Sequence, residues 1–279
     1  MRLRVNRKTT AAGCCLSLLA LGGAGIADAL PTSKGKIVAE SGRQSRADAE
    51  RIMRTIAPKT IAPSAAFAAR PPYGRVAALS SKRLAGFPRS GSKYMILSNG
   101  NATSADNKNS SGSTSQNAGG PTIRGARDVT IFRINLRVPK SANCLSFRFR
   151  FLTEEFPEFV AQEFNDGFIA ELDSTTWSTN MIGSPRIDAP RNFATGEQGK
   201  LISVNGVGTT NVSKAQAKGT TYDGATRILR ASSRIKPGNH TLYLSIFDQG
   251  DRQYDSSVFV DRLTLSSQAS CQSGAVQDQ

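Results

Sequence analysis

The sequence has little of what most catalytic sites are built from. Its 279 residues include one histidine, one tryptophan and four cysteines. The histidine, His240, lies in "PGNHTLYL", where a turn leads into a strand, and no G-x-S-x-G elbow accompanies it, so a Ser-His-Asp hydrolase is disfavoured. Phosphate-loop and dinucleotide fingerprints are also absent from the sequence.

No apolar run reaches the roughly 18 residues of a membrane-spanning helix. The longest run, Ala11 to Ile26, is short and rich in glycine, follows Arg2, Arg4, Arg7 and Lys8, and ends in Ala27-Asp28-Ala29. This order is typical of a secretory signal peptide with an A-x-A cleavage site. We therefore expect export, cleavage after Ala29, and a mature chain without a transmembrane segment.

Few cysteines remain after this cleavage. Cys14 and Cys15 lie inside the signal peptide, which leaves Cys144 and Cys271. Export places these two residues in an oxidising compartment, so a disulfide is the simplest outcome. Two separate buried thiols are the alternative.

Positive charge is in excess. The chain carries 36 basic and 21 acidic residues, for a formal net charge of +15. Such a charge suits contact with anionic surfaces such as teichoic acid, lipid headgroups or acidic polysaccharide, although it would also keep an exported protein soluble. Nucleic acid is not an expected partner, because no RNP, zinc-finger or helix-turn-helix signature occurs.

The composition divides the mature chain into three segments. Residues 30–86 are rich in Ala, Arg, Ser and Pro, and are predicted to be a poorly ordered segment with one short helix from Arg46 to Ile56, followed by the linker "APSAAFAARPPYG". Residues 87–269 are predicted to be the folded domain, and residues 270–279 a C-terminal tail. Within the domain, Asn99 to Gly120 is expected to be a polar loop.

Residues 87–269 contain short segments of period two separated by Gly, Asn, Ser and Pro. In "IFRINLRV" apolar residues alternate with Arg133, Asn135 and Arg137, and in "LSFRFRF" with Arg148 and Arg150. This is the pattern of antiparallel strands with one buried face. With no long helix, it predicts an all-β fold, a two-sheet sandwich of jelly-roll type.

The strand "VFVDRLTL" differs from the others because it carries an acid among apolar residues. Strict alternation places Asp261 on one face with Phe259, Leu263 and Leu265. A buried carboxylate is costly without a cation or hydrogen-bond donors. Asp261 is therefore expected to have one or the other.

Acidic residues gather in two stretches of this basic chain. "EEFPEFVAQEFNDGFIAELD" begins at Glu154 and holds seven carboxylates, no Lys or Arg occurs between Arg150 and Arg186, and "DQGDRQYDSSVFVD" begins at Asp248. Oxygen ligands of this kind suit calcium rather than zinc. The predicted calcium ligands are Glu155, Asn165, Asp166 and Asp261, with Glu154, Asp248, Asp251 and Asp255 as secondary metal or structural candidates. The alternative is that backbone N–H groups satisfy Asp255 and Asp261 and that Glu158, Glu171 and Asp173 are solvated charges at strand edges.

Two carboxylates across a cleft would also suffice to hydrolyse a glycoside. The acids are available, but such clefts are generally lined with aromatic residues, and the chain has one Trp and five Tyr. A secreted glycoside hydrolase is therefore kept as the alternative function.

Several motifs together resemble one known family. The stretches "GSKYMILSNGNA", "LSFRFRFLTEEFPEFVAQEFNDGFIAELD", "ISVNG", "TYDGAT" and "GNHTLYLSIFDQGDRQYDSSVFVDRL" follow one another between Phe87 and Leu265. In this order they resemble the choice-of-anchor L domain, a family of exported bacterial modules with varied C-terminal surface anchors. The resemblance implies an extracellular adhesion or binding role and a shared role for the acidic motif positions.

The chain departs from the family pattern after Cys271, because no sorting motif, hydrophobic helix or basic tail follows. Simple secretion is therefore expected. The sequence as a whole favours a secreted, non-catalytic module that binds a glycan or another cell-surface polymer and is stabilised by calcium. Its oligomeric state is left open.

Overall fold

The computed structural model describes residues 35–39, 45–110, 114–180 and 186–278. All of them belong to one compact unit, Ser33–Gln279. The expected signal peptide, with its cleavage site after Ala29, lies outside the described residues. Within the described part, no helix is long and apolar enough to cross a membrane.

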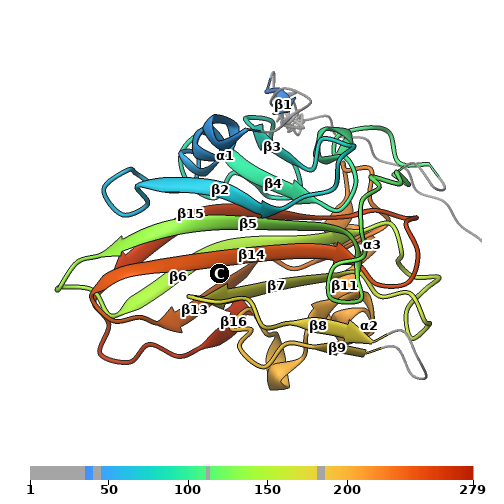
Figure 1. Cartoon of the computed structure of the whole chain (residues 1–279). Coiled ribbons are helices and arrows are strands. Elements are labelled where there is room, and N and C mark those ends of the chain that lie inside the picture. The colour runs from blue at the N-terminus through green and yellow to red at the C-terminus, as the bar shows by residue number, and fades with distance from the viewer. Residues whose placement is uncertain (1–34, 40–44, 111–113, 181–185, 279) are drawn as a thin grey trace, which may run out of the picture. The chain divides into compact units, whose positions relative to one another are not determined.

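Two antiparallel sheets form the body of this unit (Figure 1). The five-stranded sheet has the order β10-β7-β14-β5-β2. Its strands are β10 (Ile202–Ser203), β7 (Gly167–Leu172), β14 (Gly238–Asp248), β5 (Arg127–Val138) and β2 (Ser64–Ala69). The nine-stranded sheet has the order β1-β3-β4-β15-β6-β12-β11, and β13 also pairs with β6 and with β16. Its strands are β1 (Ile37–Ala39), β3 (Ala77–Ser80), β4 (Tyr94–Ser98), β15 (Ser256–Ser266), β6 (Cys144–Thr153), β12 (Gly224–Thr226), β11 (Val212–Ser213), β13 (Leu229–Arg234) and β16 (Gly274–Gln277).

The remaining elements are short. They are the hairpin of β8 (Ser178–Asn180) and β9 (Arg186–Asp188), the α-helices α1 (Arg46–Met53), α2 (Val204–Val207) and α3 (Lys214–Ala217), and two 3₁₀ turns at Ala102–Ser104 and Glu197–Gly199. The chain is therefore all-β, as predicted.

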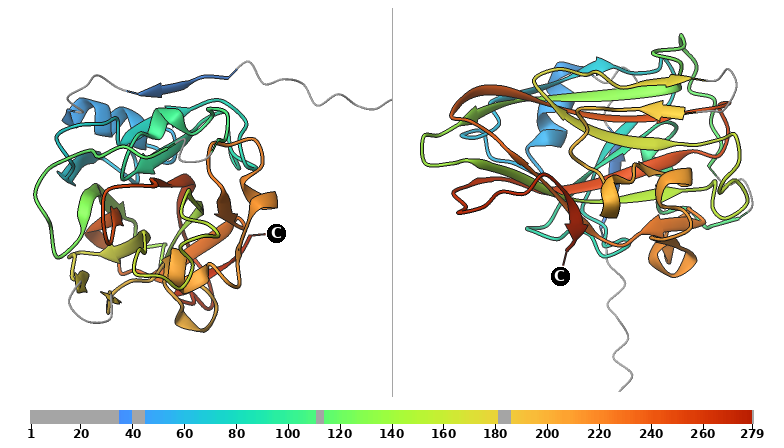
Figure 2. Two further views of the ribbon diagram at one scale, coloured as in Figure 1. Left: turned by 90° about the vertical axis from the view of Figure 1, so that its right-hand side faces the viewer. Right: turned by 90° about the horizontal axis from the view of Figure 1, so that it is seen from below.

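The main core lies between the two sheets, which form facing layers (Figure 1, Figure 2). On β5 the predicted alternation is confirmed, because Phe132, Ile134 and Leu136 are buried while Arg133 and Arg137 are exposed. Aromatic rings meet across the layers, as between Phe149 of β6 and Phe168 of β7, whose centroids lie 5.2 Å apart. Burial of such apolar area is the dominant favourable contribution to folding.

The interpretation of residues 30–86 as a poorly ordered segment with a linker is wrong for the described part of that range. The helix forms close to its expected place, but the residues expected to be a linker supply β2, which pairs with β5. Helix α1 contacts β2, β3 and β4, and buries Ile52 and Met53 in the main core. The alanines of β2 are small enough to pack beneath this helix, whereas a composition-based prediction treats them only as low-complexity sequence.

The outer face of each sheet is partly covered by loops and short elements that bury further apolar side chains. Leu84, Phe87, Tyr94 and Phe259 belong to a second apolar cluster on the nine-stranded sheet. Trp177 stacks on Phe247 with ring centroids 4.2 Å apart, within a third cluster. These additional layers bury residues that strict alternation would place in solvent.

Arg150 shows the consequence of this cover. Alternation places it outward, yet its side chain is buried. Its guanidinium donates to the carbonyls of Ala85 and Gln216 and to Gln216 Oε1. Burial, followed by the charge of Arg89, lowers the pKa of Arg150 to about 10.

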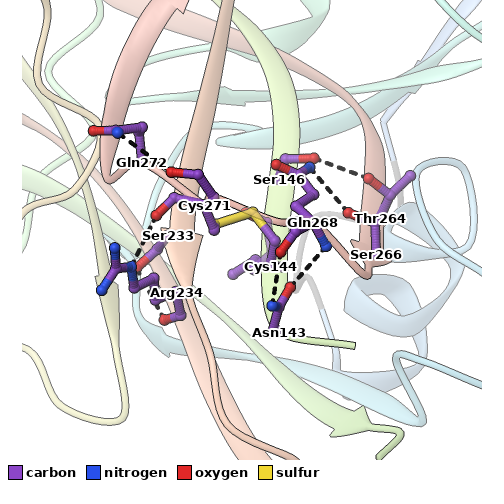
Figure 3. The surroundings of a disulfide bond; sticks show 12 residues. Asn143, Cys144, Ser146, Ser233, Arg234, Thr264, Ser266, Gln268, Cys271 and Gln272 are labelled. Carbon is purple, nitrogen blue, oxygen red and sulfur yellow. Dashed lines mark hydrogen bonds between the residues drawn. A yellow bond between two sulfur atoms is a disulfide. The ribbon is translucent and has the colours of Figure 1, made fainter. Parts of the chain in front are cut away.

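A disulfide joins Cys144, at the start of β6, to Cys271, in the tail after β15 (Figure 3). The predicted pairing is confirmed. Arg234 Nε donates to the Cys271 carbonyl at 3.0 Å, and Asn143 Nδ2 donates to the Gln268 carbonyl at 2.9 Å. The tail is thereby held against the sheet, and residues 274–277 continue it as β16.

Candidate functional site

One end of the sandwich collects acidic residues from four strands. Strands β6 and β14 end there, whereas β7 and β15 begin there, since Thr153 lies opposite Ser256 and Phe247 opposite Gly167. The acidic cluster consists of residues adjoining these strand ends: Glu154, Glu155, Asp166, Asp248, Asp251 and Asp255. The antiparallel connections thus place acids from two distant stretches of sequence at one end of the fold.

Two members of the cluster are held by the polar loop of residues 99–120. Thr114 Oγ1 donates to Glu154 Oε2 at 3.1 Å. The Gln116 N–H donates to both carboxylate oxygens of Asp255, at 3.1 and 3.2 Å. Burial still raises the pKa of Asp255 to about 7. For Glu154 and Asp255 the structure supports hydrogen-bond donors as partners.

The centre of the cluster is formed by Glu155, Asp166 and Asp248, all of which are buried. The Asp166 N–H donates to Glu155 Oε2 at 3.1 Å, and Asn99 Nδ2 donates to Asp166 Oδ2 at 2.7 Å. The Asp251 N–H donates to Asp248 Oδ1 at 3.1 Å. We call these three side chains the central carboxylates.

Burial raises the pKa of each central carboxylate, and neighbouring acids raise it further. For Glu155 the contributing charges are Asp248 and Asp251, and for Asp166 they are Glu155 and Asp248. The pKa of Asp248 rises to about 8. After burial, the largest charge contributions to these three pKa values come from other acids, and the largest opposing contributions come from hydrogen bonds.

Two predicted ligands lie outside this centre. Asp261 lies in the middle of β15 opposite Arg148, whereas the cluster adjoins the start of that strand. Its Oδ2 accepts from the N–H groups of Arg89 and Ser90, at 2.7 and 2.8 Å. Asp261 therefore has backbone N–H groups as partners. The prediction that it binds a metal together with Glu155 and Asp166 is wrong.

The predicted grouping of Asp261 with apolar residues holds for Phe259, two residues earlier on the same face of β15, but not for Leu263. A bulge between Asp261 and Thr264 shifts the register of β15 against β6, and Arg262 has a φ of +52°. Leu263 consequently packs in the main core, while Phe259 packs in the outer cluster. One extra residue in a strand reverses the alternation, and the sequence carries no glycine here to reveal it.

Asn165 is close to the cluster, but its amide has other partners. Its Oδ1 accepts from the Asn205 N–H at 2.8 Å, and its Nδ2 donates to Gln249 Oε1 at 3.3 Å. Glu158 is exposed, as expected of a solvated charge. Glu171 is instead buried and accepts from the N–H and hydroxyl of Thr176.

Across the described part of the chain, no three His, Cys, Asp or Glu side chains converge in a preformed metal site. The sequence thus predicted that Glu155 and Asp166 lie close together, but it did not predict how their carboxylates are arranged. Calcium binding stays a prediction.

A second candidate site was missed by the sequence analysis. Arg148 of β6, Arg230 of β13 and Arg262 of β15 line one pocket of about 160 Å³ on the outer face of the nine-stranded sheet. Arg230 and Gln268 also line an adjoining pocket of about 620 Å³, which extends past β16. We call these two pockets the arginine groove. Its remaining polar lining includes Ser146, Ser232, Thr264, Ser266, Ser270 and Gln272.

Like charges lie side by side in this groove. Arg230 lies directly opposite Arg148 in the β13–β6 register, and like charges in this arrangement are destabilising. Arg148 Nε forms an ion pair with Asp278 Oδ2 at 2.7 Å. Arg230 and Arg262 are exposed and form no ion pair within the described residues. The only signal in the sequence was the alternation of Arg with apolar residues, which does not show which strands are neighbours.

The comparisons with known proteins give a family. The model of the choice-of-anchor L domain matches residues 79–266. The chain belongs to this family. A search of curated proteins found no match.

A solved structure titled "Structure of TmCBM61 in complex with beta-1,4-galactotriose" is similar to this chain at 8% identity, with a TM-score of 0.29. The similarity covers 73% of this chain and 87% of that chain. At this TM-score the likeness supports no conclusion about fold or ligand. The choice-of-anchor L assignment therefore rests on the family match alone.

Proposed function

We propose that this choice-of-anchor L protein is an exported, non-catalytic binding module whose arginine groove binds an anionic cell-surface polymer. The observation that carries the proposal is the convergence of Arg148, Arg230 and Arg262 from three strands around one groove. Guanidinium groups match carboxylate, sulfate and phosphate groups in geometry as well as in charge. An anionic polymer would offset the repulsion between these arginines.

The rest of the lining supports a hydrated, flexible ligand. Hydroxyl and amide side chains surround the arginines, and no aromatic side chain other than Phe147 lines the described groove. Ser146 and Thr264 share a hydrogen bond of 2.9 Å, so their hydroxyls are held in place beside the arginines. Hydrogen bonds and charge, rather than stacking on a ring, would then select the polymer.

Export is supported by the signal-peptide pattern and by the disulfide, because disulfides persist in oxidising compartments. A glycan bearing carboxylate groups and a phosphate-bearing wall polymer have the same recognition chemistry. Direct binding measurements distinguish these two sources.

The competing function, glycoside hydrolysis, needs two carboxyl groups about 5 to 10 Å apart that face an open cleft. The central carboxylates are buried and so do not face one. In the described part of the chain, the arginine groove has Glu197 as its single carboxylate, and the neighbouring pocket near His240 has Asp173. This arrangement favours binding without hydrolysis.

The test compares two double variants of equal charge. Arg230→Gln with Arg262→Gln removes the exposed arginines of the groove, whereas Arg133→Gln with Arg137→Gln removes two exposed arginines of β5. Binding to immobilised polygalacturonate, polyphosphate and neutral dextran is measured at 0.1 M salt, where charges separated by more than about 10 Å are largely screened.

The groove variant should lose about tenfold in affinity for an anionic polymer, which corresponds to ~1.4 kcal/mol. The β5 variant should stay within about twofold of the unmodified protein. Equal losses in both variants would show that net charge alone is responsible and would refute the groove. Release of reducing ends from any polymer would refute the non-catalytic assignment.

A further inference from the structure

One acid of the C-terminal tail contacts an arginine of the groove. Asp278 follows β16, and its side chain is only 6% exposed. Its Oδ2 atom lies 2.7 Å from Arg148 Nε and 3.5 Å from Arg89 Nη2. Arg148 is one of the three arginines that line the groove. A carboxylate of the chain itself therefore binds to a guanidinium that an anionic ligand of the groove would contact.

The contact between Asp278 and Arg148 depends on charge more than on hydrogen bonding. Asp278 Oδ2 and Arg148 Nε are both buried and 2.7 Å apart, yet neither forms a hydrogen bond within the described residues. A guanidinium and a carboxylate interact most strongly through two parallel N–H···O bonds. An anionic group of a ligand is free to adopt that geometry, whereas Asp278 is restricted by its own N–H, which donates to the Ile228 carbonyl at 2.9 Å.

The segment that carries Asp278 lies at the edge of the nine-stranded sheet. β16 pairs with β13 through four residues, and in the described part of the chain it pairs with no other strand (Figure 1). Its single residue in the main core is Ala275. An edge segment with few buried apolar contacts opens at a small fraction of the free energy of global unfolding. Residues 274–278 can therefore detach while the sandwich stays folded.

The disulfide would keep a detached tail close to the groove. Cys271 lies three residues before β16 and is bonded to Cys144 of β6, the strand that also carries Arg148. A tethered group has a high effective concentration at its site. Asp278 would consequently return to Arg148 whenever a ligand dissociates.

We propose that Asp278 is an internal competitor of the polymer, and that the tail regulates the arginine groove by exchanging this carboxylate for an anionic group of the ligand. The inference rests on the proposed function and names the regulation of the same site. Only molecules in which Asp278 has left Arg148 offer the complete groove, so the apparent affinity falls with that fraction. By thermodynamic reciprocity, polymer binding loosens the tail by the factor by which the tail weakens polymer binding.

The experiment compares Asp278→Asn with Asp188→Asn in the exported, oxidised chain. Both variants remove one negative charge, but Asp188 is exposed on β9 and does not line the groove. Affinities for polygalacturonate and for polyphosphate are measured at 0.1 M salt. Asp278→Asn should bind one or both polymers at least about fivefold more tightly than the unmodified protein, and Asp188→Asn should stay within about twofold. The polymer that shows the gain identifies carboxylate or phosphate as the competing group.

Hydrogen exchange in the unmodified protein provides a second measurement that needs no variant. The N–H groups of Ala275 and Asp278 donate to the carbonyls of Thr195 and Ile228, at 2.7 and 2.9 Å. Saturation with the polymer should speed the exchange of these two amides by about fivefold or more. An ion pair with a structural role alone predicts unchanged or slower exchange.

Two results would overturn the proposal: an affinity of Asp278→Asn no higher than that of Asp188→Asn, or unchanged protection of β16 in the saturated protein. If either occurs while the Arg230→Gln, Arg262→Gln variant still loses affinity, the role of the tail is refuted and the groove stands. If neither the unmodified protein nor Asp278→Asn binds an anionic polymer, the proposed function is refuted, and the role of the tail with it.

Discussion

Removal of the Cys144–Cys271 disulfide should destabilise the protein more than most single contacts would. The two cysteines are 127 residues apart, and the chain-entropy model gives about 5 kcal/mol at 25 °C for a loop of this length. The folded state of the variant should keep most of its tail contacts, because β16 pairs with β13 independently of the sulfur atoms. For a domain of this size the loss corresponds to a fall of roughly 10 °C in melting temperature.

The assay is urea unfolding at pH 7, followed by the fluorescence of Trp177, which is buried against Phe247. The Cys144→Ala, Cys271→Ala double variant is compared with the oxidised protein and with the unmodified protein in reductant. The double variant and the reduced protein should have similar free energies of unfolding, because both lack the disulfide. They differ only in whether residues 144 and 271 are alanines or free cysteines. A loss below about 1 kcal/mol would refute the assignment of the stabilisation to loop closure. A large difference between the double variant and the reduced protein would show that side-chain packing dominates.

Three further perturbations test the core, the surface and β15. Phe149→Ala removes a ring packed against Phe168 between the sheets and should cost about 3 to 5 kcal/mol in urea unfolding; a cost below 1 kcal/mol would contradict its place in the core. Asp173 is a pH-dependent contact: its partial burial opposes ionisation, but hydrogen bonds from His240 and the Thr241 N–H lower its pKa overall. The contribution of Asp173 to stability is therefore present above its pKa in the unfolded chain, about 3.9, and is lost as the pH falls through its lower pKa in the folded protein. Asp173→Asn should accordingly lower the melting temperature more at pH 6 than at pH 2.5, and an equal change at both values would refute this linkage. Asp261→Ala leaves the Arg89 and Ser90 N–H groups without their acceptor, and should cost about 1 to 3 kcal/mol equally with and without calcium; a calcium-dependent cost would return Asp261 to the metal site.

The sheet content could be predicted because period-two alternation is a local property. Arg133 and Arg137 point to solvent on β5 as the sequence indicates. Arg150, by contrast, is covered by a loop and by α3, and such cover depends on segments distant in sequence. The strand β2 was missed for the same reason, since its alanines become a strand only through pairing with β5 and packing under α1.

The acidic cluster was predicted in its residues but only in part in its geometry. Glu155 and Asp166 meet as expected, whereas Asp261 is placed elsewhere by its position along β15. The bulge in that strand then turns Leu263 inward without any signal from glycine or proline.

The sequence by itself determined the all-β class, the choice-of-anchor L resemblance, the cysteine pair and the concentration of acids, because each depends on residue type and local order. Tertiary structure alone decided which side chains meet. The arginine groove exists because β13, β6 and β15 are neighbours in one sheet, and the central carboxylates meet because strands of both sheets begin or end at one edge. Strand order is set by long-range packing and register, so no local pattern encodes either site.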